Sequence, residues 1–221
     1  MTRLRAVLFD MDGTLVDTEG VWLDVVEAAA LRRGRVLDAG RRTAVTGRSV
    51  EDAAALLHAY LGAPEGELAA ELGTDFADRL AAAAVPRPGA LRLLAALRAR
   101  EVPTALVSAS PRAVVEQVAG TLDGHRFDVL FGAEDTARTK PQPDPYLAAA
   151  AALGAEPAQC VAVEDSPAGV ASAVAAGCRV LAVPSTEPLA ESDGVTVAES
   201  LADVDPELLS SLVRWHDDTT T

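Results

Sequence analysis

Short, largely apolar runs alternate with stretches of helical periodicity through most of the chain. Such runs are typical of strands buried on both faces of a parallel sheet, and they occupy residues 6–9, 102–107, 127–131, 160–163, 179–183 and 195–198. Apolar spacing and Pro or Gly boundaries predict helices over residues 90–100, behind Pro111, over 146–153, between Pro167 and Gly177, and over 206–214. Strands that alternate with helices predict an α/β fold built on a parallel sheet.

The interval 17–85 breaks this alternation, because its pattern is helical only. Apolar residues at helical spacing predict a first helix over 22–31, a second over 53–61 and a third over 67–84, with no strand among them. A helical insert directly behind the first strand is typical of a domain that covers a site and excludes water. We therefore expect an inserted α-helical cap domain of residues 17–85 and a Rossmann-like core of residues 1–16 and 86–221.

Composition and charge narrow the classes of partner. The chain has 221 residues, of which 49% are hydrophobic, and its apolar runs are too short to predict a membrane span. The first residues lead into the first strand without a signal peptide, which favours a cytoplasmic protein. A net charge of −14 argues against nucleic acid and anionic membrane surfaces as partners. An anionic substrate would need local screening, which a divalent cation and a few basic residues would supply.

The first predicted strand is followed by two aspartates, Asp10 and Asp12. An extended chain would place them on the same side of the strand, about 7 Å apart. Ligands of open α/β sheets bind at this end of the strands, and Gly13 lets the backbone leave the sheet sharply. A plain turn of Asp, Gly and Thr is the alternative. A carboxylate nucleophile beside an acid or base group would split a hydrolysis into two easier steps.

Two further segments offer groups that suit phosphate. Ser108 and Ala109 follow the second strand at the start of a helix, a place suited to phosphate oxygens, although an ordinary capping serine would have the same pattern. Lys140 is the only lysine of the chain, and the prolines around it predict a rigid loop that presents this one side chain.

A second pair of acids, Glu164 and Asp165, follows the strand predicted over 160–163. Oxygen ligands from separate strands, with room left for water and phosphate oxygen, favour Mg²⁺ over zinc. Asp10 and Asp165 are the first-choice ligands. Acids that cap the helix behind Pro167 are the alternative reading of this pair.

Taken in order, these four segments resemble the motifs of the haloacid dehalogenase superfamily, and the resemblance covers essentially the whole chain. It implies that Asp10 attacks phosphorus to form an aspartyl-phosphate, and that Asp12 protonates the leaving oxygen and later deprotonates water. It adds the backbone carbonyl of Asp12 to the metal ligands, and leaves open whether Glu164 binds the metal directly or supports it from behind. The residues implied to bind phosphate are Ser108, Ala109 and Lys140.

Within this superfamily the chain resembles the β-phosphoglucomutase and phosphoglycolate phosphatase subgroup, which has a helical cap. Asp12 argues against dehalogenases and phosphonatases, which do not keep an aspartate there. Sugar phosphomutases of the subgroup have a histidine in the first cap helix and an arginine in the cap loop, where this chain has Trp22 and Val50. Neither residue can both hold a second phosphate and exchange protons. The resemblance therefore favours a phosphatase.

Substrate choice would rest with the cap. Trp22 would stack on a sugar ring or fill the apolar seam, Gly47 would permit close backbone approach, and Arg48 would offer a forked donor or stay solvated. We expect an Mg²⁺-dependent phosphatase for a small phosphorylated metabolite, with a sugar or polyol phosphate preferred over phosphoglycolate or a nucleotide monophosphate, in a monomer or weak homodimer. A sugar phosphomutase and a non-catalytic binding protein are the alternatives.

Overall fold

The chain forms two compact units in the computed structural model, which describes residues 3–46, 48 and 50–214. Unit 1 consists of Met1–Val16 and Pro86–Thr221, and unit 2 consists of Asp17–Val85. The chain leaves and re-enters unit 1 at adjacent points: Val16 forms a β-bridge with Pro86, and the Arg87 backbone N–H donates to the Leu15 carbonyl at 2.8 Å.

Unit 1 is built on a parallel sheet of six strands in the order β3-β2-β1-β4-β5-β6. This is the strand order of the Rossmann arrangement, so the predicted fold class is confirmed. β1 lies at the centre between β2 and β4, and all four of its residues are buried, as its wholly apolar sequence predicts. The strands are Ala6–Phe9 (β1), Thr104–Val107 (β2), Val129–Phe131 (β3), Cys160–Glu164 (β4), Arg179–Ala182 (β5) and Val195–Val197 (β6).

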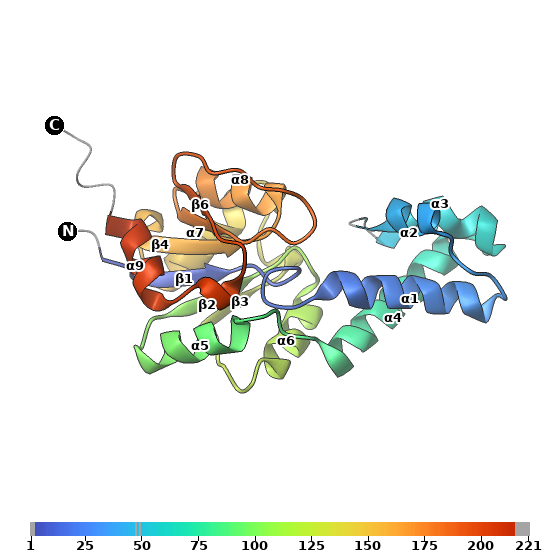
Figure 1. The fold of residues 1–221 in the computed structure, drawn as a ribbon, viewed down its shortest axis with the longest axis horizontal. Helices are drawn as coiled ribbons and strands as arrows, with labels where there is room; N and C mark the ends of the chain where they lie inside the picture. Colours follow the sequence, from blue (N-terminus) through green and yellow to red (C-terminus); the bar gives the residue numbers. More distant parts are fainter. Residues whose placement is uncertain (1–2, 47, 49, 215–221) are drawn as a thin grey trace. The chain divides into compact units, whose positions relative to one another are not determined.

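Helices cover both faces of this sheet (Figure 1). Tyr146 and Ala149 of α7 and Ala173 of α8 pack in one core cluster with Ala6 and Leu8 of β1. Side chains alternate along a strand, so the intervening residues of β1 point to the opposite face. α9 packs against β4 and β5 and also contacts α5. The helices of unit 1 are Ala90–Ala99 (α5), Arg112–Thr121 (α6), Asp144–Ala152 (α7), Pro167–Ala175 (α8) and Pro206–Arg214 (α9).

Unit 2 contains helices only in its described residues. They are Thr18–Arg32 (α1), Ala39–Val45 (α2), Val50–Leu61 (α3) and Glu65–Ala83 (α4). The sequence predicts three helices here, and α2 is the one it misses: only Val45 is buried in this helix, so it has no apolar stripe. α4 runs through Gly73 as one helix, because packing of its buried face against α1 and α3 outweighs the low helix propensity of a single glycine.

Within the described residues, no helix has both the length and the apolar character that crossing a membrane requires.

Candidate active site

The carboxyl ends of β1, β2 and β4 bring together most of the predicted site residues. Asp10 follows β1, Ser108 follows β2, and Glu164 ends β4. Because these three parallel strands are neighbours, their carboxyl ends lie at one edge of the sheet, where ligands of such folds bind. Lys140 reaches the same edge from the loop before α7.

Gly13 makes this packing possible. Its φ of +80° lies in the left-handed region, and a Cβ at this position would lie 2.1 Å from Asp165 Oδ2. Any side chain here would therefore be strained and would displace the second acid pair. The turn behind Gly13 is closed by backbone bonds from Leu15 and Val16 to the Met11 carbonyl, at 3.0 and 3.1 Å.

Lys140 is held by three acceptors. Its Nζ donates to Asp10 Oδ1 at 2.6 Å, to Glu164 Oε1 at 2.7 Å and to the Val107 carbonyl at 2.8 Å. An ammonium group has three N–H donors, so these contacts use all of them. An arriving phosphate oxygen would have to share or displace one of these contacts, while the buried positive charge offsets the surrounding carboxylates.

Asp10 has one engaged and one unengaged oxygen. Oδ1 accepts the hydrogen bond from Lys140, whereas the buried Oδ2 has no hydrogen-bond partner among the described residues. Burial raises the pKa of Asp10 well above its ordinary value, and the positive charge of Lys140 opposes this shift. A buried carboxylate oxygen without a partner is costly unless a ligand meets it. Asp10 Oδ2 is therefore the atom of this site that is free to bind or react.

Glu164 is fully buried and bound on both oxygens. Oε1 accepts from Lys140 and from the Tyr146 hydroxyl at 2.5 Å, and Oε2 accepts from the Ser166 hydroxyl and the Asp165 backbone N–H, both at 3.3 Å. These contacts favour the alternative in which Glu164 supports the site from behind. Burial raises the pKa of Tyr146, so its hydroxyl keeps its proton and remains a donor.

Asp165 is held by two hydroxyls. Thr14 Oγ1 donates to Oδ1 at 3.3 Å, and Ser185 Oγ donates to Oδ2. Burial raises the pKa of Asp165 to about 6. Carboxylate oxygens of Asp10, Glu164 and Asp165 lie within 4.8 Å of one another, close enough to ligate one ion. A donor set made of carboxylate oxygens alone fits a hard cation such as Mg²⁺.

Asp12 faces the hydroxyls that follow β2. Its Oδ2 accepts from Ser108 Oγ at 2.8 Å and from Ser110 Oγ at 2.9 Å. Burial raises the pKa of Asp12, and the two hydroxyls oppose this shift. A carboxyl group that keeps its proton more readily than usual suits a general acid. Ala109, between these two serines, is exposed.

The structure describes two of the three predicted cap residues, Trp22 and Arg48. Trp22 is only 5% exposed, because its ring packs edge-on against Phe76 and its Nε1 donates to the Val45 carbonyl at 2.9 Å. Its ring therefore packs in the core of unit 2, which favours the alternative in which Trp22 fills the apolar seam. Arg48 is exposed, in keeping with either predicted role, while Gly47 lies outside the described residues.

Five described side chains of this site received no predicted role: Thr14, Ser110, Tyr146, Ser166 and Ser185. Ser166 directly follows Asp165 in the sequence. Thr14 and Ser110 stand inside the segments that mark Asp10 and Ser108, so their proximity to a functional residue was a usable signal. Tyr146 and Ser185 have no such signal, because they meet Glu164 and Asp165 only through the fold.

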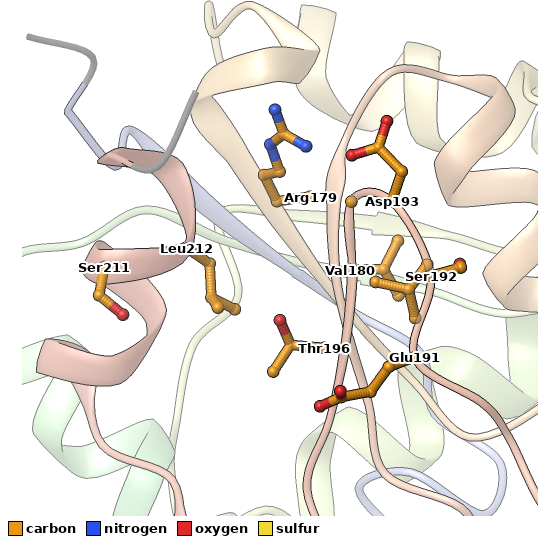
Figure 2. A pocket seen from close by; sticks show the side chains of 10 residues that line it. Arg179, Val180, Glu191, Ser192, Asp193, Thr196, Ser211 and Leu212 are labelled. Carbon is orange, nitrogen blue, oxygen red and sulfur yellow. The ribbon is translucent and has the colours of Figure 1, made fainter. Parts of the chain in front are cut away.

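A cavity of about 710 Å³ lies away from this site, at the amino ends of β5 and β6. Figure 2 shows Ser211 and Leu212 of α9 on one side of it and Glu191 to Asp193, from the loop before β6, on the other. None of the predicted site residues that the structure describes lines it. The cavity is therefore separate from the carboxylates at the opposite ends of the strands.

The sequence matches the family of haloacid dehalogenase-like hydrolases over residues 4–177. Validoxylamine A 7'-phosphate phosphatase of Streptomyces hygroscopicus subsp. limoneus is 35% identical over 215 residues, 96% of this chain and 96% of that protein. Hexitol phosphatase A of Escherichia coli is 35% identical over 191 residues, 82% of this chain and 83% of that protein.

Two further matches differ in extent. The bifunctional riboflavin kinase/FMN phosphatase of Arabidopsis thaliana is 36% identical over 186 residues, 81% of this chain, and the chain spans about half (48%) of that relative. A crystal structure of a HAD family hydrolase from Deinococcus radiodurans R1, with bound phosphate and sodium, has a TM-score of 0.72 and 30% identity, with 97% of each chain covered. The family match includes every residue of the site described above except Ser185, and the chain therefore belongs to the haloacid dehalogenase-like hydrolases.

Proposed function

We propose that this chain is an Mg²⁺-dependent phosphatase that hydrolyses a small phosphate monoester through an aspartyl-phosphate on Asp10. The observation that supports this most is the state of the Asp10 carboxylate. It is buried, its Oδ1 is held by the only lysine of the chain, and its Oδ2 has no partner among the described residues. A fixed carboxylate with one free oxygen is arranged as a nucleophile.

The reaction has two displacements at phosphorus. In the first, Asp10 Oδ2 forms a bond to phosphorus, the ester P–O bond breaks, and the proton on Asp12 passes to the leaving oxygen. In the second, Asp12 takes a proton from water, the water oxygen attacks phosphorus, and inorganic phosphate leaves Asp10. The raised pKa of Asp12 suits the first transfer, and the two serine hydroxyls that stabilise its charged form suit the second.

The phosphate would be bound by Ser108, Ala109 and the positive charge of Lys140. Mg²⁺ would be held by the carboxylates of Asp10 and Asp165 and the backbone carbonyl of Asp12, with Glu164 behind them. When bound, the cation supplies positive charge that offsets the negative charge of the transferring phosphoryl group. Lys140 adds a second, permanent positive charge at the same place.

The substrate class is a sugar or polyol phosphate. The relatives support this class, since one is named as a hexitol phosphatase and another as a phosphatase of a 7'-phosphate. We assign unit 2, residues 17–85, the role of a cap that selects the substrate and excludes water. Val50 stands where a mutase of this subgroup would have a second phosphate-binding arginine, and a valine cannot bind phosphate oxygen by charge.

Phosphate release from a panel of sugar, polyol, glycolate and nucleotide phosphates tests this function, with Mg²⁺ and with a chelator. We expect metal-dependent release from a few sugar or polyol phosphates. Asp10→Asn should abolish turnover, since the amide is no nucleophile, and the chain should still fold. Asp203→Asn, at an exposed carboxylate of unit 1, is the matched control and should retain full activity.

Three outcomes would contradict the proposal. Wild-type turnover that survives in Asp10→Asn would exclude the aspartyl-phosphate. Isomer formation that requires a bisphosphate primer, in place of phosphate release, would indicate a mutase. If the wild-type chain releases no phosphate and forms no isomer from any compound of the panel, with or without a primer, a binding protein would be indicated.

A further inference from the structure

Tyr146 is a tyrosine whose hydroxyl lies inside the carboxylate cluster, and the mechanism above does not use it. The side chain is fully buried in the first turn of α7, six residues beyond Lys140. Its hydroxyl donates to Glu164 Oε1 at 2.5 Å, and Lys140 Nζ lies 5.2 Å from the centre of its ring. Phenylalanine would fill the same space without introducing a polar atom, so the buried hydroxyl calls for a specific role.

The hydroxyl shares its acceptor with Lys140. Glu164 Oε1 accepts from both groups, and the same Lys140 ammonium donates to Asp10 Oδ1. The contacts therefore form one chain from the tyrosine hydroxyl through Glu164 and Lys140 to the nucleophile. Among the described residues, the other Glu164 oxygen accepts two hydrogen bonds of 3.3 Å, and Lys140 donates to Oε1 at 2.7 Å. The 2.5 Å bond from the tyrosine hydroxyl is therefore the shortest that this carboxylate receives from them.

We infer that Tyr146 is a positioning residue, which fixes the Glu164 carboxylate so that Lys140 stays in contact with Asp10 and faces the phosphate site. The inference rests on the proposed function and adds a residue to its machinery. It follows from the nature of lysine, whose ammonium sits on a flexible four-carbon stem and takes the position that its acceptors define. If Glu164 can rotate, Lys140 loses its fixed place, and the charge that the phosphate meets is displaced.

The replacement Tyr146→Phe removes the hydroxyl alone, and the chain offers a matched control. Tyr60 is the only other tyrosine, its hydroxyl donates to the Val36 carbonyl at 2.7 Å in unit 2, and it has no role in the site. We expect Tyr146→Phe to lower kcat/KM for a small phosphate monoester about tenfold and to weaken the binding of inorganic phosphate by a similar factor. Tyr60→Phe should leave both quantities unchanged, and the unfolding midpoints should show that both variants are folded.

A second comparison separates positioning from a general structural effect. If the hydroxyl acts through the charged carboxylate, its removal should matter little once that charge is gone. In a Glu164→Gln background we expect Tyr146→Phe to lower kcat/KM less than threefold. The effects of the two substitutions are not additive when both act through the same contact. A tenfold loss in both backgrounds would overturn the inference, as would a Tyr146→Phe variant that behaves like Tyr60→Phe.

The wild-type assay distinguishes failure of the proposed phosphatase function from failure of the positioning role of Tyr146. Absence of phosphate release by the wild-type chain would refute the proposed function. Calorimetric titration with inorganic phosphate in the presence of Mg²⁺ would still test the role of Tyr146, because it requires no turnover. Weaker binding by Tyr146→Phe than by Tyr60→Phe would support the positioning role, and equal binding by the two variants would overturn it.

Discussion

Gly169, the third residue of α8, leaves room for the Glu164 carboxylate, which accepts a hydrogen bond from Lys140. A Cβ on this residue would lie 1.9 Å from Glu164 Oε2 and 2.0 Å from both Cδ and Oε1 of the same group. In most helices, replacement of glycine by alanine is stabilising by up to about 1 kcal/mol, because alanine is the better helix former. At this position we expect replacement by alanine to destabilise the fold instead.

The magnitude follows from the geometry. Ordinary contact of a Cβ begins at 3.4 Å, so the Glu164 carboxylate, whose Oε2 would lie at 1.9 Å, would have to move by about 1.5 Å in Gly169→Ala. Its 2.7 Å contact with Lys140 would not survive such a displacement. A misplacement of about 1 Å in a catalytic group can cost about 100-fold in rate, which is the loss in kcat/KM that we expect. Overpacking costs about 1–3 kcal/mol, which outweighs the helix propensity and should leave a net destabilisation of about 1 kcal/mol.

Urea unfolding and steady-state phosphate release would measure these two effects. Gly120→Ala is the matched control, because Gly120 lies in α6 and the added Cβ would meet no described atom within 4 Å beyond its chain neighbours and the backbone of its own helix. That variant should gain about 0.5–1 kcal/mol in stability and keep its activity. A Gly169→Ala chain that is as stable as Gly120→Ala, or that retains wild-type kcat/KM, would refute the reasoning about Glu164.

Two other predictions concern pH. Ser110→Ala should raise the pKa of Asp12, because the Ser110 hydroxyl opposes the upward shift that burial causes. The alkaline limb of the pH profile of kcat/KM, where the general acid loses its proton, should therefore move to higher pH. A limb that does not move would argue against Asp12 as the acid. Glu71, bound to Arg32 and Arg33 across α1 and α4, has its pKa lowered from 4.5 to about 2. Its stabilising effect is therefore full above pH 4.5 and is lost as the pH falls towards 2. After discounting for the exposure of Arg32, we expect Glu71→Gln to lose about 1–2 kcal/mol in urea unfolding at pH 7; a loss that did not shrink on acidification would contradict the assignment.

Much of the fold could be predicted because its strands are buried on both faces. Each strand of the sheet is marked by an apolar run, and the Gly and Pro residues between the runs mark where the helices begin and end. The sequence does not predict α2, because one buried residue gives no helical periodicity. Trp22 was ambiguous for a related reason: an aromatic residue at a periodic position satisfies the pattern of a core and the chemistry of a sugar site equally well.

The candidate site was predictable as far as its residues follow strand ends. Asp10, Ser108 and Asp165 lie at positions where topology alone brings them together. What the sequence does not contain is the arrangement of hydrogen bonds among buried groups. Whether Glu164 meets a cation or a lysine depends on the orientation of one carboxylate, and the partner that orients it, Tyr146, lies on a separate helix.

The adjacent entry and exit points of unit 2 have a consequence for how such a chain can diversify. Residues 17–85 leave and return between Val16 and Pro86, which are already bridged, and all side chains assigned to the chemistry lie outside that interval. A different insert could be joined at the same two residues without altering the register of any strand. The residues to which we assign the chemistry and the insert to which we assign the selection of substrates are thus separate segments of the chain, so that one could be exchanged while the other is kept.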